Sequence, residues 1–577
     1  MKSVVYNCLI LILLLSSNMI VSGQNVQSVE RIYLQTDRDI YIAGEKLFFK
    51  CFCFDAKTNK PLVMSKYAYV VLRDEYNSFI SKICLRLENN IFSGSIYLPD
   101  TLITGRYQLV SFTNFMRNEG EQVFFTKEIL VANRFDKDLI RIYDHLTDAD
   151  ATVTKPSGFW EGIEMNLLPL TSEKKIYGKR EKIRVCLESA GLKDNETANI
   201  SISVHEKIPL SGNPETPLNC TENTNIFNTT SNMSNCSYLP EINGVIIKGK
   251  VYNLDNHDAI PDATVFLSTP DTFSNLQSTQ TNQQGAFGFQ LTDYYTGKNI
   301  ILNLPEINKA GIVLDNQFEL ENVFKPSRHF PDSLLKDFLI KSQHIVQVQK
   351  IYKIETGKDF DVGVSSKLSP PMVYPPVSDA VYPADFISLP DFVEISREIL
   401  PLLKIREHKS IQEARIFDVD NHQLFDSDPM IFLDGVPINN INQIINLGTE
   451  EINKIEVSST KRYSGNLYFS GILAVFTKRM EINNISWQTP MLSVKYVSLH
   501  PASEFIMPNY SKESRLPDFR QLLYWEPSLT LKANEKIYIE FQASDNKGEF
   551  EITVFGITSE GKFVSVNSTI KITNLSN

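Results

Sequence analysis

Short apolar runs at regular spacing fill the first part of the chain, with turn residues such as Gly and Asn-Asn between several of them. The runs cover residues 31–37, 46–54, 67–72, 79–87, 91–98, 107–112 and 123–131. Runs of this kind at even spacing are typical of antiparallel strands that stack as two sheets. The pattern therefore predicts a β-sandwich over residues 24–135.

Part of this pattern recurs later in the chain. Ile-Tyr, three residues and Glu-Lys-Leu at 40–47 return as Ile-Tyr, three residues and Glu-Lys-Ile at 176–183, an offset of 136 positions. A turn followed by a strand is common, but this offset equals one domain plus a linker. The repeat predicts a second sandwich over residues 161–240, with a polar, Asn-, Thr- and Ser-rich insertion at 211–237.

Three further segments follow from their turns and periodicity. Residues 241–325 alternate strands with a Pro turn and a Gly turn, which predicts a third sandwich. Residues 326–385 contain several prolines and one helical stretch near 334–347, which indicates a linker that winds over its neighbours. Residues 515–577 form alternating strands around a turn, which predicts a C-terminal sandwich.

Residues 386–480 mix helix and strand. Apolar positions from 391 to 403 have helical spacing, and apolar strand candidates follow it. These strands lie at 414–418, 430–437, 452–457 and 471–477. We therefore expect a mainly β fold of tandem β-sandwich domains with one small α/β domain.

Composition narrows the class of protein. The chain has 577 residues, of which 42% are hydrophobic and 22% charged, so disorder and coiled coil are excluded as its main body. At roughly 150 residues per domain, the length indicates about four domains. A net charge of −11 disfavours a broad nucleic-acid-binding surface, so no nucleic acid is expected as a partner.

The first residues have the pattern of a secretory signal peptide over 1–23. Lys2 precedes the unbroken apolar run 8–15, and small residues at 21–23 favour cleavage before Gln24. The alternative is an uncleaved membrane anchor, which the shortness of the run disfavours. No later segment approaches about 18 apolar residues, so we expect no transmembrane segment in the mature chain.

Six cysteines remain after such a cleavage, in a compartment where disulfides form. Four of them lie in strand-like runs and favour buried free thiols: Cys51, Cys53, Cys84 and Cys186. Cys220 and Cys236 lie in the polar insertion, where a disulfide between them would restrain a loose loop; free thiols are the alternative. No Cys/His cluster has zinc spacing.

The repeat resembles the strand-turn-strand signature of macroglobulin-type domains in the alpha-2-macroglobulin family, roughly Thr-Asp-x-x-x-Tyr-x-x-Gly-Glu. The matching residues are Thr36, Asp37, Tyr41, Gly44 and Glu45. Ala43 stands where the family usually has Pro. The second copy keeps Tyr177 and Glu181 but has Arg180 at the Gly position. The resemblance implies immunoglobulin-like, macroglobulin-type sandwiches.

Two later segments resemble other families. Gly249-Lys250-Val251, the run 260–265 and the run 281–287 are similar to carboxypeptidase regulatory-like domains, which are small transthyretin-like sandwiches. The Asp-Gly-Val-Pro strand end, the Ile-x-x-Ile-Glu-Val strand at 452–457 and the Gly-Ile strand at 471–477 resemble the plug domain of TonB-dependent outer-membrane receptors. The whole order resembles exported multidomain envelope proteins of the Bacteroidota.

Catalytic motifs are missing from the sequence. A macroglobulin thioester needs Cys-Gly-Glu-Gln, but residues 119–122 begin with Glu119, which cannot form it, so we expect a strand-end turn. Neither a G-x-S-x-G nor an H-E-x-x-H motif occurs. The densest acidic group lacks the Gly of a calcium loop and favours a solvated turn; it consists of Asp418, Asp420, Asp426 and Asp428. We therefore expect no catalytic residue, no cofactor and no metal.

These features favour an exported, non-enzymatic binding or assembly protein of a Gram-negative cell envelope. It would be periplasmic, associated with the outer membrane or on the cell surface. The sandwiches would be spacers and the plug-like segment the contact module for an envelope or outer-membrane protein. The alternatives are a protease-interacting macroglobulin without a thioester, an accessory component of TonB-dependent uptake, and a hydrolase with an unrecognised site. A complete receptor is disfavoured, because only 97 residues follow Met480 and its barrel needs about 220.

The expected partner contact lies at the apex of the plug-like segment. A Gly-x-Pro turn presents backbone groups on a rigid support, and a loop follows it. The candidate contact residues are Asp434, Gly435, Val436, Pro437, Asn439 and Asn442. The alternative is that this turn only reverses the chain inside a small α/β domain.

Overall fold

The structure is a computed structural model, and it describes most of the chain beyond residue 28. The described residues are 29–88, 91–136, 163–165, 167–208, 237–304, 307, 309–325, 333–354, 357–360, 377–408, 411–439, 441–464, 467–480, 490–496, 499–500, 502–510 and 515–574. The predicted signal peptide, the Cys220–Cys236 disulfide and the polar insertion, except for Ser237, lie outside them. The fold is mainly β, as predicted.

The first sandwich stacks two mainly antiparallel sheets with apolar inner faces. One sheet has the order β1-β3-β6, with bounds Glu30–Thr36, Lys46–Asp55 and Phe92–Tyr97. The other has the order β2-β8-β7-β4-β5, with bounds Ile40–Ile42, Phe125–Ala132, Gly105–Phe112, Tyr67–Arg73 and Phe79–Arg86. The short 3-10 helices η1 (Phe115–Asn118) and η2 (Glu121–Val123) connect β7 to β8.

The second sandwich repeats this topology with strands from two distant parts of the chain. One sheet has the order β10-β12-β32, with bounds Leu170–Ser172, Lys182–Glu188 and Lys536–Gln542. The other has the order β11-β34-β33-β13-β31, with bounds Ile176–Gly178, Phe563–Thr573, Gly548–Thr558, Thr197–Glu206 and Leu522–Lys532; β9 (Ile163–Met165) pairs with β34. Strand for strand, the two orders match those of the first sandwich.

This arrangement differs from the two separate sandwiches that the sequence predicts over 161–240 and 515–577. Both strands that pair with β13, namely β31 and β33, come from the C-terminal segment. β33 also adds Phe550 and Val554 to the core that contains Ile200 and Val204 of β13. Residues 207–521 are therefore an insertion between β13 and β31, where the first sandwich has only the short β4–β5 hairpin.

The third sandwich begins the insertion. Its sheets have the orders β17-β14-β19 and β16-β15-β18-β29. In chain order the bounds are Val245–Asn253 for β14, Thr264–Ser268 for β15, Gln277–Gln280 for β16, Ala286–Leu291 for β17, Asn299–Asn303 for β18, Ala310–Leu314 for β19 and Met491–Lys495 for β29. Thus β29, which lies far outside the predicted segment 241–325, completes one sheet of this domain.

We call residues 377–480 the α/β domain. Its main sheet has the order β21-β27-β28-β25-β26, with bounds Asp379–Val381, Ile452–Ser464, Leu467–Thr477, Met430–Leu433 and Val436–Ile438. A smaller sheet has the order β22-β23-β24, with bounds Leu403–His408, Ile411–Asp418 and Gln423–Leu424. The short 3-10 helices η6 (Pro383–Asp385) and η7 (Ile441–Gln443) and the helix α4 (Phe392–Glu398) complete it. β21 lies before residue 386, in the predicted linker.

The helix expected over 391–403 is shorter than its apolar spacing indicates. α4 covers Phe392–Glu398, and the carboxylate of Asp391 caps it by accepting the backbone N–H of Glu394 at 2.9 Å. Pro401 disfavours the helical conformation at the residue before it, so the helix ends and Leu403 begins β22.

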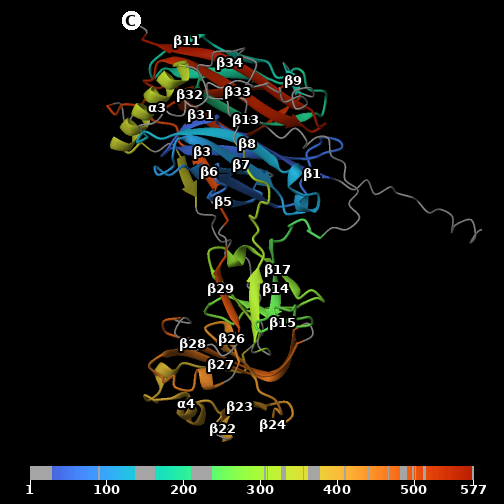
Figure 1. The fold of residues 1–577 in the computed structure, drawn as a ribbon. Coiled ribbons are helices and arrows are strands. Elements are labelled where there is room, and N and C mark those ends of the chain that lie inside the picture. The colour runs from blue at the N-terminus through green and yellow to red at the C-terminus, as the bar shows by residue number, and fades with distance from the viewer. Residues whose placement is uncertain are drawn as a thin grey trace, which may run out of the picture.

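The chain runs twice along the molecule, which is elongated (Figure 1). The first and second sandwiches pack together at one end, the third sandwich follows, and the α/β domain forms the other end. Helix α3 (Ser333–Ile351), expected near 334–347, packs Leu335, Leu339 and Val346 against β2 and β8 of the first sandwich. β20 (Gly357–Phe360) pairs with β30 (Ala502–Phe505) on the return path. Within the described residues, no helix is both long and apolar enough to cross a membrane.

Candidate functional site

The signature residues of the first sandwich hold the turn from β2 to β3. The carboxylate of Asp37 is buried and accepts the Tyr41 hydroxyl and the Phe48 backbone N–H, each at 2.8 Å. Burial raises the pKa of Asp37 to about 6. Glu45 accepts the backbone N–H of Ile42 at 2.7 Å. These residues therefore have a structural task, and the signature fixes a turn.

The second copy builds the same turn from different side chains. Glu181 accepts the backbone N–H of Gly178 at 2.6 Å, as Glu45 does in the first copy. Arg180 has a positive φ of 57°, at the position where Gly44 has 96°. Its guanidinium donates to both carboxylate oxygens of Asp545, at 2.8 and 2.5 Å. This bidentate pair ties the turn to the loop after β32, which accounts for an Arg where the signature has Gly.

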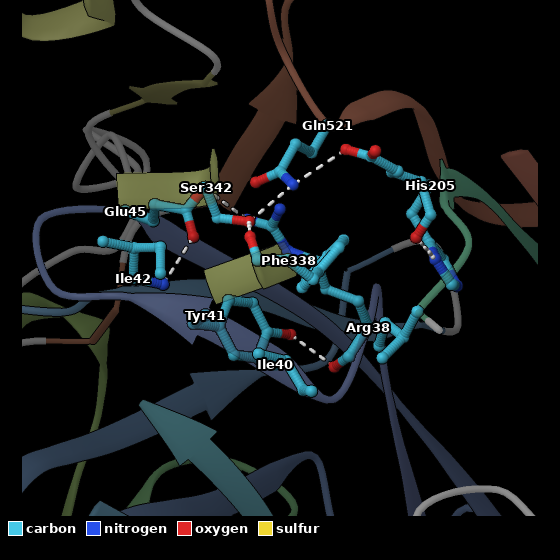
Figure 2. Close-up of a pocket in the computed structure, with 11 residues that line it drawn as sticks. Arg38, Ile40, Tyr41, Ile42, Glu45, His205, Phe338, Ser342 and Gln521 are labelled. Carbon is cyan, nitrogen blue, oxygen red and sulfur yellow. Dashed lines mark hydrogen bonds and ion pairs between the residues drawn. The ribbon is translucent and has the colours of Figure 1, made fainter. Parts of the chain in front are cut away.

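Figure 2 shows a small hollow where the first sandwich, the second sandwich and α3 meet. Its lining residues are Arg38, Ile40, Tyr41, Ile42, Glu45, His205, Glu206, Ile208, Phe338, Ser342 and Gln521. Glu206 forms an ion pair with Lys341 of α3 and accepts from Gln521 at 2.8 Å and Asn546 at 2.7 Å. Gln521 also donates to Ser342 at 2.7 Å. These bonds hold α3 to the second sandwich, and Ile40 and Ile42 of the first sandwich pack in one apolar cluster with Phe338 of α3. We call this hollow and its contacts the clamp.

The chemistry of this clamp does not indicate catalysis. The His205 ring lies 3.1 Å from the backbone oxygen of Glu206, and burial lowers the pKa of this histidine. Both carboxylates that line the hollow, Glu45 and Glu206, accept from groups of this chain. Sequence reasoning missed the clamp, because its residues are hundreds of positions apart and follow no motif.

The predicted contact turn lies against the third sandwich of the same chain. The backbone oxygen of Asp434 accepts the N–H of Asp271, in the third sandwich, at 2.9 Å. The carboxylate of Asp434 accepts the Thr477 N–H at 2.6 Å. At Gly435, whose φ is 83°, an added Cβ would lie 2.7 Å from the Phe273 backbone oxygen. The turn is therefore used inside the molecule, whereas the sequence predicts a contact with a partner there.

The rest of this turn is covered in the same way. Val436 is buried with Ile301 of β18, and the backbone oxygen of Pro437 accepts from the Asn303 amide at 3.2 Å. Phe432 and Phe476 of the main sheet pack in one cluster with two residues of the third sandwich, Phe266 in β15 and Leu276 just before β16. Because apolar strands at this end need a cover, the neighbouring sandwich supplies it.

Asn439 and Asn442, the other predicted contact residues, are half-buried. The side-chain oxygen of Gln443 accepts the Asn439 backbone N–H at 3.0 Å. The Asn442 amide exchanges two hydrogen bonds with the backbone of Gln412 in β23, each at 3.2 Å. Both residues thus fasten a loop within the α/β domain. The structure does not bring them into one exposed surface with the turn.

The α/β domain exposes other apolar side chains that sequence reasoning did not single out. Tyr463 and Tyr468 stand opposite each other near the end of the β27–β28 hairpin, with ring centroids 5.3 Å apart. Their exposed fractions are 74% and 45%. Phe386 and Ile387, after η6, are also at least half exposed. The sequence does contain a signal for these two exposed tyrosines, because aromatic residues stand close to a hairpin turn, where polar residues are usual.

The remaining sequence predictions concern thiols, the thioester and metals. Cys51, Cys53 and Cys84 are buried free thiols, as predicted, and Cys186 is free but only half-buried. Glu119 forms a bidentate pair with buried Arg31, at 2.7 and 2.8 Å, in the expected turn. In the described part of the chain, no three His, Cys, Asp or Glu residues gather as a metal site.

Comparison with known proteins identifies one segment by sequence. Residues 31–127 match the MG2 domain family, and this match supports macroglobulin-type domains in the chain. It covers the first sandwich, and the second sandwich shares its strand order. No curated protein matches the chain.

Among solved structures, the chain is similar to two bacterial macroglobulins. For Salmonella alpha-2-macroglobulin reacted with methylamine, the identity is 9% and the TM-score 0.24, over 95% of this chain and 40% of the other. The native conformation of Escherichia coli alpha-2-macroglobulin gives the same values. The Escherichia coli adhesin FdeC matches at 11% identity and a TM-score of 0.14, over 30% of this chain and 45% of its own. The chain thus spans less than half the length of each structure.

Proposed function

We propose that this chain is a non-catalytic, macroglobulin-type binding protein of a Gram-negative cell envelope. The sandwiches act as a spacer, and the α/β domain contacts an envelope or outer-membrane protein. The proposal includes export through the N-terminal signal, and it assigns the contact to exposed side chains of the α/β domain rather than to the Asp434–Pro437 turn.

One observation carries the proposal: the α/β domain lies at the end of the molecule opposite the first two sandwiches (Figure 1). Docking of its turn on the third sandwich holds it in a fixed orientation. The paired rings of Tyr463 and Tyr468 then project from a rigid support. Exposed aromatic residues are enriched where proteins bind partners, because they bury a large area at a low cost in side-chain entropy.

Photocrosslinking in intact cells tests this function. A photoreactive residue in place of Tyr463, Phe386 or Ile387 is expected to capture an envelope protein. The matched control is Tyr76 in the first sandwich, which is 72% exposed and should capture none. If only Tyr76 captures a protein, or if no position in the α/β domain does, the proposal assigns the contact to the wrong domain.

The MG2 match supports a second candidate, a protease-interacting macroglobulin without a thioester. Such a protein would hold a protease without a covalent bond, since Glu119 occupies the position of the nucleophile and pairs with Arg31. Incubation with a panel of proteases, followed by size-exclusion chromatography, distinguishes the two candidates. Co-elution of an active protease with the cleaved chain favours the second candidate, and its absence favours the first.

A further inference from the structure

The second sandwich has an open sheet edge at β32. β32 pairs with β12 on one side, and within the described ranges no strand pairs with its other side. The matching strand of the first sandwich is β6, because Tyr97 stands opposite Lys46 as Gln542 stands opposite Lys182. β6 lies beside β30 of the same chain, and the hydroxyl oxygens of Ser95 and Ser503 are 2.7 Å apart. Among the described residues, the chain therefore contacts this edge in the first sandwich and leaves it open in the second.

The backbone of β32 presents hydrogen-bonding groups to that open side. The Ala543 N–H donates to Glu181 at 2.9 Å, so residues in phase with Ala543 direct their backbone groups to the β12 side. Alternate residues of an antiparallel strand direct these groups to opposite sides. Lys536, Tyr538 and Glu540 are out of phase with Ala543, so their N–H and C=O groups point to the open edge.

The side chains at the same positions are complementary to themselves. If a second β32 runs antiparallel about a two-fold axis at Tyr538, Lys536 stands opposite Glu540 of the second copy, and the reverse. Both side chains are accessible, with exposed fractions of 59% for Lys536 and 43% for Glu540. On the inner face, half-buried Ile537 would stand opposite Ile539 of the second copy.

We propose that two copies of this chain associate through β32, which joins the β10-β12-β32 sheets of both into one continuous sheet. The occupant of the edge is a second copy, because the outward backbone groups and the charge order fit the same strand in reverse. The pairing centres on Tyr538, which is 53% exposed and stacks under the Arg184 guanidinium at 4.2 Å. The dimer presents two α/β domains, and two linked contact points raise the apparent affinity for a partner that offers two sites.

Sedimentation velocity of the mature chain, from micromolar to millimolar concentration, tests the dimer. The wild-type chain is expected to shift from monomer to dimer over this range. Tyr538→Pro removes an N–H that points to the open edge and none that bonds to β12, so it should remain monomeric with an unchanged melting temperature. A wild-type chain that stays monomeric throughout overturns the proposal, as does a Tyr538→Pro variant that dimerises equally well.

Charge exchange tests the register. Lys536→Glu and Glu540→Lys each place like charges opposite one another and should raise the dissociation constant of the dimer about tenfold. The double variant restores opposite charges and should recover dimerisation. Lys182→Gln is the matched control, because it removes a partner of Glu540 within the chain, at 2.6 Å, and leaves the pairing between copies intact. Failure of the double variant to recover, with Lys182→Gln as damaging as the single reversals, contradicts this register.

Discussion

At the scale of single residues, buried charges fix the first sandwich. The Arg31 and Glu119 side chains are 0% and 1% exposed, and they form a bidentate pair between β1 and the η1–η2 turn. An ion pair with no access to water depends on both partners, because removal of one leaves the other charge buried and uncompensated.

Glu119→Gln is therefore expected to lower the free energy of unfolding by about 3–5 kcal/mol. Urea unfolding followed by circular dichroism measures the loss. Glu560→Gln is the control, because Glu560 and its partner Lys60 are both about half exposed, and this change should cost less than about 1 kcal/mol. Equal effects of the two variants would contradict a special role for the buried pair.

Glu241 makes the contact between the first and third sandwiches dependent on pH. Its carboxyl accepts the Tyr69 hydroxyl at 3.0 Å and the Ile246 N–H at 2.7 Å. Burial raises the pKa of this carboxyl to about 7 from a model-compound value of 4.5. The folded state thus binds the proton more tightly than the unfolded state. The stabilisation by the proton is complete below about pH 4.5 and is lost as pH rises to about 7.

Glu241→Gln keeps an acceptor for Tyr69 and removes the ionisation. We expect the variant to lose less stability than wild type between pH 5 and pH 8, by an amount on the order of 3 kcal/mol or below. Urea unfolding of both proteins at the two pH values measures the difference. Identical pH profiles would show that Glu241 ionises as freely in the folded chain as in the unfolded one.

At the scale of elements, the Asp434–Pro437 turn determines how the α/β domain sits on the third sandwich. Gly435 combines a φ of 83° with a backbone oxygen only 2.7 Å from the position of an added Cβ. An alanine here would adopt an unfavourable positive φ, and its Cβ would lie too close to this oxygen. The turn would therefore have to move away from the loop at 271–275.

Gly435→Ala should weaken this docking by about 1–3 kcal/mol. The Asp271 amide, which donates to Asp434, reports the change, and its hydrogen exchange should accelerate by about tenfold or more. Gly105→Ala is the control, because its added Cβ would meet no atom within 4 Å. If exchange at Asp271 is unchanged in the Gly435 variant, the turn does not hold the domain.

At the scale of the whole molecule, the second sandwich closes only when the C-terminal strands return. β11 pairs in parallel with β34, as β2 pairs in parallel with β8 in the first sandwich. The insertion thus begins and ends in the second sandwich, whose two parts lie more than 300 positions apart in the sequence. The covalent order of the chain and the order of its domains are different.

Removal of residues 515–577 tests this framing. If those residues formed a sandwich of their own, the remaining chain would stay soluble and folded. Because they supply β31 to β34, their loss leaves β13 without both of its sheet neighbours and removes much of the shared apolar core, so we expect the second sandwich to aggregate. Excision of residues 377–480 is the control, since it removes a whole domain and leaves the strands of the second sandwich complete. Solubility and a thermal melt measure both outcomes.

The sequence by itself determined the features that depend on local pattern. Alternating apolar residues and turn residues fixed the strand content, the signature around Asp37 and Glu45 fixed the repeated turn, and the burial of Cys51, Cys53 and Cys84 follows from the strands that carry them. Alternating apolar and polar residues indicate which side of a strand faces a core, because the polarity of each side chain decides whether it is buried.

Only the tertiary structure decided which strands share a sheet. Nothing local distinguishes β32 as the neighbour of β12, or β29 as the neighbour of β18, because a strand edge offers the same backbone groups to any partner. The same holds for the Asp434–Pro437 turn, whose Gly-x-Pro pattern is equally compatible with an exposed apex and with a buried contact. Partner choice between distant segments depends on which apolar faces remain uncovered after local structure has formed, and that is a property of the assembled molecule.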